Sequence, residues 1–153
     1  MSALPDLSLT YRRMSVEDLT SVCAIEQRIY PFPWTRGNFF DSINACYTCT
    51  VLECAGTIVG YAILSAAVGE SHLLNLSIDA QWQRRGLGRA LLLHQIDLAR
   101  ARGATIMLLE VRPSNTVGRA LYANTGFEQI AVRRGYYPAH GSREDALLLG
   151  LKL

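Results

Sequence analysis

The stretch Gln83-Arg84-Arg85-Gly86-Leu87-Gly88-Arg89-Ala90 decides how this chain folds around a ligand. An apolar, strand-like run (73–78) precedes it, and a long amphipathic helical pattern (87–102) begins inside it. Glycines at a strand-to-helix turn let the backbone approach a ligand closely. The first N–H groups of the helix lack an intrahelical partner and carry the positive end of its dipole. We therefore predict that this turn binds a phosphate or pyrophosphate, helped by the charges of Arg84, Arg85 and Arg89.

Two other glycine-rich phosphate motifs do not match this turn. A dinucleotide-binding fingerprint needs a third glycine at position 91, which is leucine here. It also needs an acidic residue about 20 residues later on a following strand, and none stands there. A P-loop needs Gly-Lys followed by Ser or Thr, which the sequence lacks. The turn therefore matches neither the dinucleotide-binding nor the P-loop pattern.

Length and composition predict one domain, 1–153. The chain has 153 residues, half of them apolar, which is enough for a core without disulfides. The net charge of +2 is mild, so we expect no direct nucleic-acid partner. The first residues lack a basic segment followed by an apolar one, and the longest uncharged stretch (55–69) is too short to cross a bilayer. We expect a cytoplasmic protein without membrane contact.

The cysteines raise the question of a metal or redox site. Cys46-Tyr47-Thr48-Cys49 is formally a C-x-x-C, and Cys54 follows. Residues 46–53 have a strand-like composition, and positions i and i+3 of a strand face opposite sides. No second C-x-x-C or histidine pair completes four ligands. We therefore expect no metal and four reduced, packed cysteines.

Hydrophobic periodicity, caps and turn residues predict an α/β domain with a mixed sheet. The predicted order is β-α-α-β-β-β-α-β-α-β-β. Strands are predicted at 7–11, 46–53, 57–66, 72–79, 105–111, 127–132 and 145–151. Helices are predicted from the caps Ser15 and Thr35 to 29 and 43, over 87–102, and from Ser114 or Asn115 to Gly126. Residues 134–142 are predicted to form a loop.

Together these patterns resemble the GNAT superfamily of acetyl-CoA-dependent N-acetyltransferases. The signature of that family, Q/R-x-x-G-x-G/A at the start of the helix after strand four, corresponds to residues 83–88. Further segments are similar to its RimI-type branch: Glu26-Gln27-Arg28, Pro31-Phe32-Pro33-Trp34, Asn75 to Asp79, Leu109-Glu110-Val111-Arg112, Ser114-Asn115, Ala120-Leu121-Tyr122, Gly126-Phe127 and Arg134 to Pro138. The resemblance implies a GNAT fold (α+β), with a mixed, mostly antiparallel seven-stranded sheet splayed between strands four and five and with four helices.

The resemblance also implies an activity. Enzymes of the RimI type transfer acetyl from acetyl-CoA to the N-terminal alanine of small-subunit ribosomal protein number eighteen. The expected reaction is direct attack in a ternary complex, with a ribosomal small-subunit protein as partner. We expect a monomer or a weak dimer. Two alternatives stay open: a GNAT enzyme acting on lysine or a small amine, and a non-catalytic, ribosome-associated acetyl-CoA-binding module.

The resemblance assigns cofactor contacts to named positions. The pyrophosphate would bind the backbone at Arg84, Arg85, Gly86, Leu87, Gly88 and Arg89. The pantetheine arm would pair like an added strand with the backbone of Leu76, Ser77 and Ile78. Asn115 and Tyr122 would also contact the cofactor. From the residues alone, Asn115 is equally a helix N-cap, and Leu76 and Ile78 are ordinary core residues.

Two residues are candidates for proton transfer. Glu110 stands in an apolar strand, where a carboxylate is costly unless it is paired. The resemblance gives it the role of general base, acting through a water; the alternative is a strand-end glutamate that reaches solvent or Arg112. Tyr122 has a phenol that can protonate a leaving thiolate, and the resemblance gives it this general-acid role. Its alternative is a tyrosine of the core.

Aromatic segments are the candidates for binding the acceptor. Phe32 and Trp34 belong to a proline-stiffened loop, and Tyr136 and Tyr137 to a later one. In this family the corresponding loops flank the acceptor groove, which implies that these rings clamp a peptide N-terminus. Alternatively, Phe32 and Trp34 cap the core. Glu26 is expected on a solvated helix face or against the incoming amine.

Overall fold

The computed structural model describes residues 8–153, which contain one seven-stranded sheet in the order β1-β2-β3-β4-β5-β7-β6. Leu7, which we predicted in the first strand, lies outside the described residues. The elements are β1 (Leu9–Arg13), α1 (Leu19–Ile29), α2 (Arg36–Asn44), β2 (Thr48–Cys54), β3 (Thr57–Ala67), β4 (Glu70–Ile78), α3 (Leu87–Ala101), β5 (Ile106–Val111), α4 (Thr116–Thr125), β6 (Glu128–Ala139) and β7 (Ser142–Lys152). The predicted order of strands and helices is confirmed.

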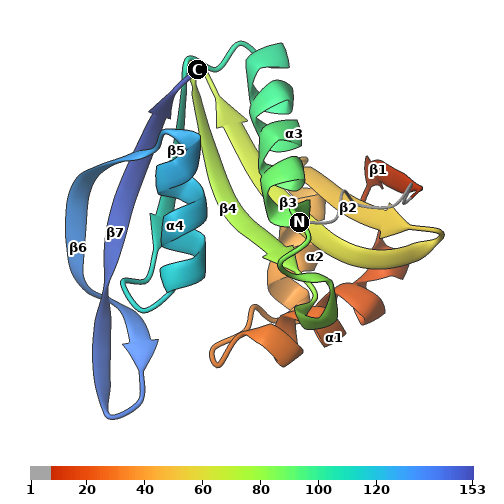
Figure 1. Cartoon of the computed structure of the whole chain (residues 1–153), viewed down its shortest axis with the longest axis horizontal. Helices are drawn as coiled ribbons and strands as arrows, with labels where there is room; N and C mark the ends of the chain where they lie inside the picture. Colours follow the sequence, from red (N-terminus) through yellow and green to blue (C-terminus); the bar gives the residue numbers. More distant parts are fainter. Residues whose placement is uncertain (1–7) are drawn as a thin grey trace.

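The sheet opens between its two central strands. All neighbouring strands are antiparallel except β4 and β5, which run parallel. These two strands pair only over Glu70–Leu73 and Ile106–Leu109. Beyond that point β4 continues to Ile78 and β5 to Val111 without pairing with each other. The predicted splay is confirmed, and in Figure 1 β6 and β7 stand apart from β2 and β3 on opposite sides of the opening.

The helices cover both faces of the sheet. One apolar cluster joins α3, α4 and the faces of β3, β4 and β5 that point toward them. A second cluster joins α1, α2 and the opposite faces of β2 and β3. Along β5, Met107, Leu109 and Val111 belong to the first cluster, so Glu110 faces the other side of the sheet. This alternation decides where the Glu110 carboxylate points.

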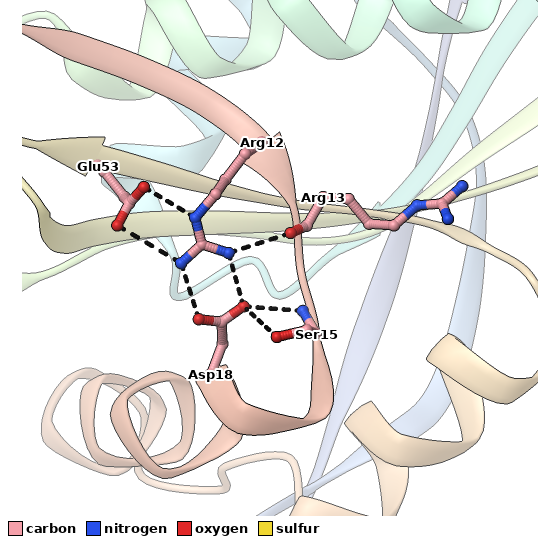
Figure 2. A network of polar contacts seen from close by, with 5 residues as sticks. All are labelled: Arg12, Arg13, Ser15, Asp18 and Glu53. Atoms are coloured by element: carbon pink, nitrogen blue, oxygen red, sulfur yellow. Dashed lines mark hydrogen bonds and ion pairs between the residues drawn. The ribbon is translucent and has the colours of Figure 1, made fainter.

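An arginine ties the first strand to the first helical turn. Figure 2 shows the Arg12 guanidinium donating to both oxygens of Asp18, at 2.8 Å each, and to Glu53 on β2 at 2.8 Å. Asp18 also accepts from the N–H of Ser15, the predicted cap, at 2.8 Å. A short 3-10 turn (Val16–Asp18) precedes α1, so the α-helix begins at Leu19 rather than directly after Ser15. The network anchors the sheet edge against α1.

The remaining predicted caps are confirmed. The Thr35 hydroxyl accepts from the N–H of Asn38 at the start of α2. Gly126 ends α4 with φ +110°, and Gly103 follows α3 with φ +82°. These left-handed conformations are the ones that glycine adopts without a steric penalty.

The prediction for Cys46 and Tyr47 is wrong. Strand β2 begins at Thr48, and Cys46 occupies a left-handed turn with φ +60°. The chain needs this turn because the Tyr47 N–H donates back to Ser42 at the end of α2. Cys46 is exposed and Cys49 is buried, so the two thiols have different surroundings. All four cysteines are free.

The loop predicted at 134–142 is also wrong. Strand β6 extends to Ala139, and a two-residue turn of His140 and Gly141 leads into β7. A register shift between Arg133 and Tyr137 accommodates Gly135, whose N–H donates to Asp145 at 2.9 Å. Tyr136 and Tyr137 therefore stand on a strand. No helix of residues 8–153 has the length and apolar character needed to span a membrane.

Candidate active site

A cavity of about 550 Å³ fills the opening between β4 and β5. Its walls come from β4, β5, the connection between α1 and α2, the start of α4, and β6. It brings together seven of the predicted site residues: Phe32, Trp34, Leu76, Glu110, Asn115, Tyr122 and Tyr137. The splay therefore creates the space that a ligand needs between two strands that would otherwise pair.

Glu110 presents an unpaired carboxylate oxygen. Its side chain is 14% exposed, and Oε2 is buried without a hydrogen-bond partner among residues 8–153. Oε1 lies 3.7 Å from Nε2 of His72 and 4.0 Å from Nη1 of Arg133. A buried acceptor without a partner is costly, so this oxygen is a place for a water or an incoming N–H group. The alternative contact with Arg112 does not form, because Arg112 pairs with Glu144 at 3.2 Å.

Tyr122 belongs to both the core and the cavity. It is 8% exposed, lines the cavity, and packs edge-on against Phe127 with ring centres 5.6 Å apart. Burial, followed by the neighbouring Tyr30 and Tyr137, raises the pKa of the Tyr122 phenol well above its usual value. The phenol therefore stays protonated at neutral pH.

Asn115 caps α4. Its Oδ1 accepts from the Gly118 N–H at 3.0 Å, which confirms the N-cap prediction. The same residue lines the cavity. A cofactor contact from Asn115 stays a prediction.

The turn over residues 84–89 lies beyond the end of β4 and does not line this cavity. Arg84 and Gly86 have left-handed φ angles of +62° and +78°, and Gly86 is the N-cap of α3. Gln83 fastens the turn to β4, because its Nε2 donates to the carbonyl of Ile78 at 3.0 Å. Leu87 is buried, whereas the arginines at 84, 85 and 89 are exposed. The helix start thus presents its backbone with positive charge around it.

A buried hydrogen-bond network holds the edge of β4, and sequence reasoning largely missed it. Glu26 is only 2% exposed, so its predicted place on a solvated face is wrong. Its carboxylate accepts from the Tyr61 hydroxyl at 2.7 Å, the Asn75 amide at 3.1 Å and the Trp34 N–H at 2.9 Å. The network therefore ties β4 to the loop that carries Trp34.

Tyr30 completes this network. Its hydroxyl donates to the Leu76 carbonyl at 3.3 Å and lies 2.7 Å from the Ser77 hydroxyl. Ser77 is buried and donates to Asn75, and Ile78 packs in the core. The Leu76 and Ile78 carbonyls thus accept from the side chains of Tyr30 and Gln83, and pairing of this backbone with a ligand stays a prediction. Tyr30 closes a helix before a proline, and only its contacts across the fold reveal its role.

The aromatic residues divide into two groups. Phe32, Trp34 and Tyr137 line the cavity, whereas Tyr136 does not and packs its ring near Arg133, 5.4 Å from the guanidinium. Trp34 also packs on Phe39 of the core, with ring centres 5.1 Å apart, which agrees with its expected place as a cap of the core. A contact of Trp34 with the acceptor stays a prediction. Burial raises the pKa of Tyr137 to about 12.

Comparison with known proteins decides the family. Residues 19–127 match the model of the acetyltransferase (GNAT) family. The chain belongs to the GNAT family. This GNAT protein is 38% identical over 144 residues to the [ribosomal protein bS18]-alanine N-acetyltransferase of Escherichia coli K12, covering 94% of this chain and 97% of the relative. The enzyme of that name from Salmonella typhimurium is 39% identical, with 92% and 95% covered.

Solved structures agree with the GNAT assignment. The crystal structure of the ribosomal-protein-S18-alanine N-acetyltransferase from Escherichia coli superposes with a TM-score of 0.87 at 38% identity, covering 94% of this chain and 93% of the other. The Ard1 structure from Thermoplasma volcanium gives a TM-score of 0.88 at 26% identity, covering 96% and 99%. The predicted GNAT fold is confirmed, and acetyl-CoA is the acetyl donor of this family.

Proposed function

We propose that this GNAT enzyme acetylates the N-terminal α-amine of alanine on a small-subunit ribosomal protein. One observation carries the substrate: near-full-length identity of 38% and 39% to two enzymes named for that reaction. The cavity supports the chemistry, since Glu110, which has an unpaired carboxylate oxygen, and Tyr122, which has a protonated phenol, line the same space between β4 and β5.

Acetyl-CoA is proposed to lie along the opening of the sheet. Its pyrophosphate would accept from the backbone N–H groups at the start of α3, where Arg84, Arg85 and Arg89 add positive charge. Its pantetheine amides would pair with the edge of β4 at Leu76 to Ile78 that faces away from β3 and does not pair with β5, as an added strand does. This path leads the thioester from α3 into the cavity.

The proposed reaction is one direct transfer. Glu110 takes a proton from the α-amine through a bound water, and the amine nitrogen attacks the thioester carbonyl. The carbon–sulfur bond then breaks, Tyr122 protonates the sulfur, and the second proton that leaves the nitrogen returns to the Tyr122 oxygen. The pKa of an α-amine is near 8, against about 10.4 for lysine, a difference worth about 3 kcal/mol at neutral pH. A carboxylate is therefore a sufficient base for a peptide N-terminus.

The acceptor peptide is proposed to enter between the two aromatic walls. Phe32 and Trp34 form one wall, and Tyr137 forms the other. Tyr136 is not proposed to contact the peptide inside the cavity, because it does not line the cavity. Aromatic rings on stiff backbone offer contact area at a low entropic cost.

A peptide panel tests the proposal against its alternatives. The enzyme is incubated with acetyl-CoA and three peptides: one with a free N-terminal alanine, the same peptide with a blocked N-terminus and an internal lysine, and one beginning with proline. Intact mass should show one acetyl group on the first peptide only. Equal acetylation of the blocked peptide would establish the lysine enzyme instead. Binding of acetyl-CoA without any transfer, to peptides or to isolated ribosomal proteins, would establish the non-catalytic module.

A further inference from the structure

The Glu110 side chain lies between the cavity and His72. Glu110 lines the cavity, whereas His72 does not. The His72 side chain is 33% exposed, and its Nε2 lies 3.7 Å from Oε1 of Glu110. Glu110 therefore separates the cavity from a titratable side chain that reaches solvent on the other side.

The register of the two parallel strands produces this arrangement. His72 on β4 pairs with Leu108 on β5, and the ladder ends one residue later at Leu73 and Leu109. Leu108 and Glu110 point to the same face because they are two residues apart on a strand. The imidazole thus lies beside the carboxylate at the last point where β4 and β5 remain together.

The proposed reaction must release a proton at this place. An α-amine is mostly protonated at pH 7. The balance is therefore ammonium plus thioester giving amide, thiol and one proton. Two protons leave the nitrogen: Glu110 takes the first, and the second replaces the proton that Tyr122 gives to sulfur. The proton on Glu110 is therefore the one released. A thioester and a peptide that occupy the cavity would cover the carboxylate on that side.

We propose that His72 carries this proton from Glu110 to solvent; the proposal rests on the acetyltransferase function inferred above. The O–H bond of protonated Glu110 breaks as Nε2 of neutral His72 gains an N–H bond. The imidazolium then releases its Nδ1 proton to water. The 3.7 Å separation exceeds a direct hydrogen bond, so a small rotation of either side chain or one bridging water completes the path.

The charges around the pair favour this direction. Arg133 on β6 lies 4.0 Å from the same carboxylate oxygen. The Tyr137 phenol also lies near Glu110 and stays protonated, because burial raises its pKa to about 12. Glu70 shares the His72 face of β4, and Ser65, the β3 partner of His72, does not titrate in this range. His72 is thus the neighbour whose ring nitrogen lies beside the Glu110 carboxylate and whose side chain reaches solvent.

Single-turnover kinetics in weak buffer test the relay. A thiol reagent follows free coenzyme A, and a pH-indicator dye follows the proton. In the wild-type enzyme both signals should rise together. In His72→Ala and His72→Gln the proton should appear at least about tenfold later than the thiol, and imidazole should restore the coincidence. The control His94→Ala, in a residue stacked on Tyr11 away from the site, should behave as wild type.

The outcomes separate the relay from other roles. Coincident thiol and proton signals in both His72 variants without imidazole would overturn the relay. So would full recovery by glutamine with no response to imidazole, which would mark His72 as a packing residue. A wild-type enzyme that forms no thiol with an alanine peptide would refute the proposed function itself, which is a different result.

Discussion

The Arg112 guanidinium packs over the ring of Tyr137, with its central carbon 4.4 Å from the ring centre. The same guanidinium carbon lies 5.1 Å from the ring centre of Phe32, and Nη1 donates to the Pro138 carbonyl at 2.8 Å. Phe32 follows α1, whereas Tyr137 and Pro138 stand on β6. One side chain therefore joins the two walls of the candidate acceptor groove.

Replacing Arg112 with lysine should loosen that groove. An ammonium keeps the charge but loses the planar stacking and the forked hydrogen bonds. We expect KM for the alanine peptide to rise about tenfold, equivalent to about 1.4 kcal/mol, while KM for acetyl-CoA stays unchanged. Arg100→Lys on the outer surface of α3 is the control. A uniform change in both KM values would contradict a role confined to the acceptor groove.

Glu110→Gln should remove the proposed base with little change of shape. We expect kcat to fall by roughly 10²- to 10⁴-fold, because the amide cannot accept the proton of the attacking amine. Steady-state kinetics with an alanine peptide provide the measurement, and Glu128→Gln at the exposed start of β6 is the matched control. A kcat within about twofold of wild type would rule Glu110 out as the base.

Tyr122→Phe tests the proposed acid. The raised pKa of this phenol keeps it protonated across neutral pH. Its contribution to kcat should therefore be lost only above about pH 10, the usual pKa of a tyrosine. We expect kcat to fall about 10²-fold, which is at the lower end of the rate effects known for general acids. The effect is small because a thiolate is a good leaving group without full protonation. Tyr11→Phe, far from this cavity, is the control. Unchanged turnover would leave Tyr122 as a core residue only.

Gly88→Asp should abolish acetyl-CoA binding without unfolding the chain. A Cβ at Gly88 would lie 3.6 Å from Leu121 and 3.8 Å from Ile78, which is ordinary contact. The new carboxylate would repel the pyrophosphate at the start of α3. Calorimetry should show affinity reduced by at least about 100-fold, or about 2.7 kcal/mol. Gly37→Asp places the same charge in the first turn of α2 and should bind normally; equal affinity of both variants would move the phosphate site elsewhere.

The ionised Asp18 carboxylate should make the free energy of unfolding depend on pH in the acidic range. Hydrogen bonds from Arg12 lower the pKa of Asp18 from 3.8 to about 2. Since the folded value is depressed, the stabilisation is present above pH 4 and is lost as the pH falls toward 2. The side chain is 10% exposed, and the shift corresponds to about 2 kcal/mol.

Urea unfolding of Asp18→Asn measures this contribution. The variant should be less stable than wild type at pH 7, and the difference should shrink at pH 2.5. Asp97→Asn, at an exposed ion pair on α3, should show no such change. A wild-type advantage that persists unchanged at pH 2.5 would refute the assignment to the Asp18 charge.

Local patterns were sufficient for most of the elements. The glycines around residue 86, the caps Thr35 and Asn115, and the stop at Gly126 each act within a few residues of chain, so the sequence reveals them directly. The region 134–142 was misassigned because glycine, proline and arginines interrupt its alternation. Its strand depends on Asp145 and Arg143, which reach it from the partner strand β7.

The amino-acid sequence by itself determined the order of the elements and the glycine turn at the start of α3, because periodicity, capping and motif spacing are short-range properties. The roles predicted for Glu110 and Tyr122 came from the resemblance to the GNAT family. Only the tertiary structure decided that Glu26 is buried, that Tyr136 lies outside the cavity, and that His72 stands beside Glu110. Those facts arise where strands distant in the sequence meet or separate. Such contacts depend on register and packing across the sheet, which no local stretch of residues encodes.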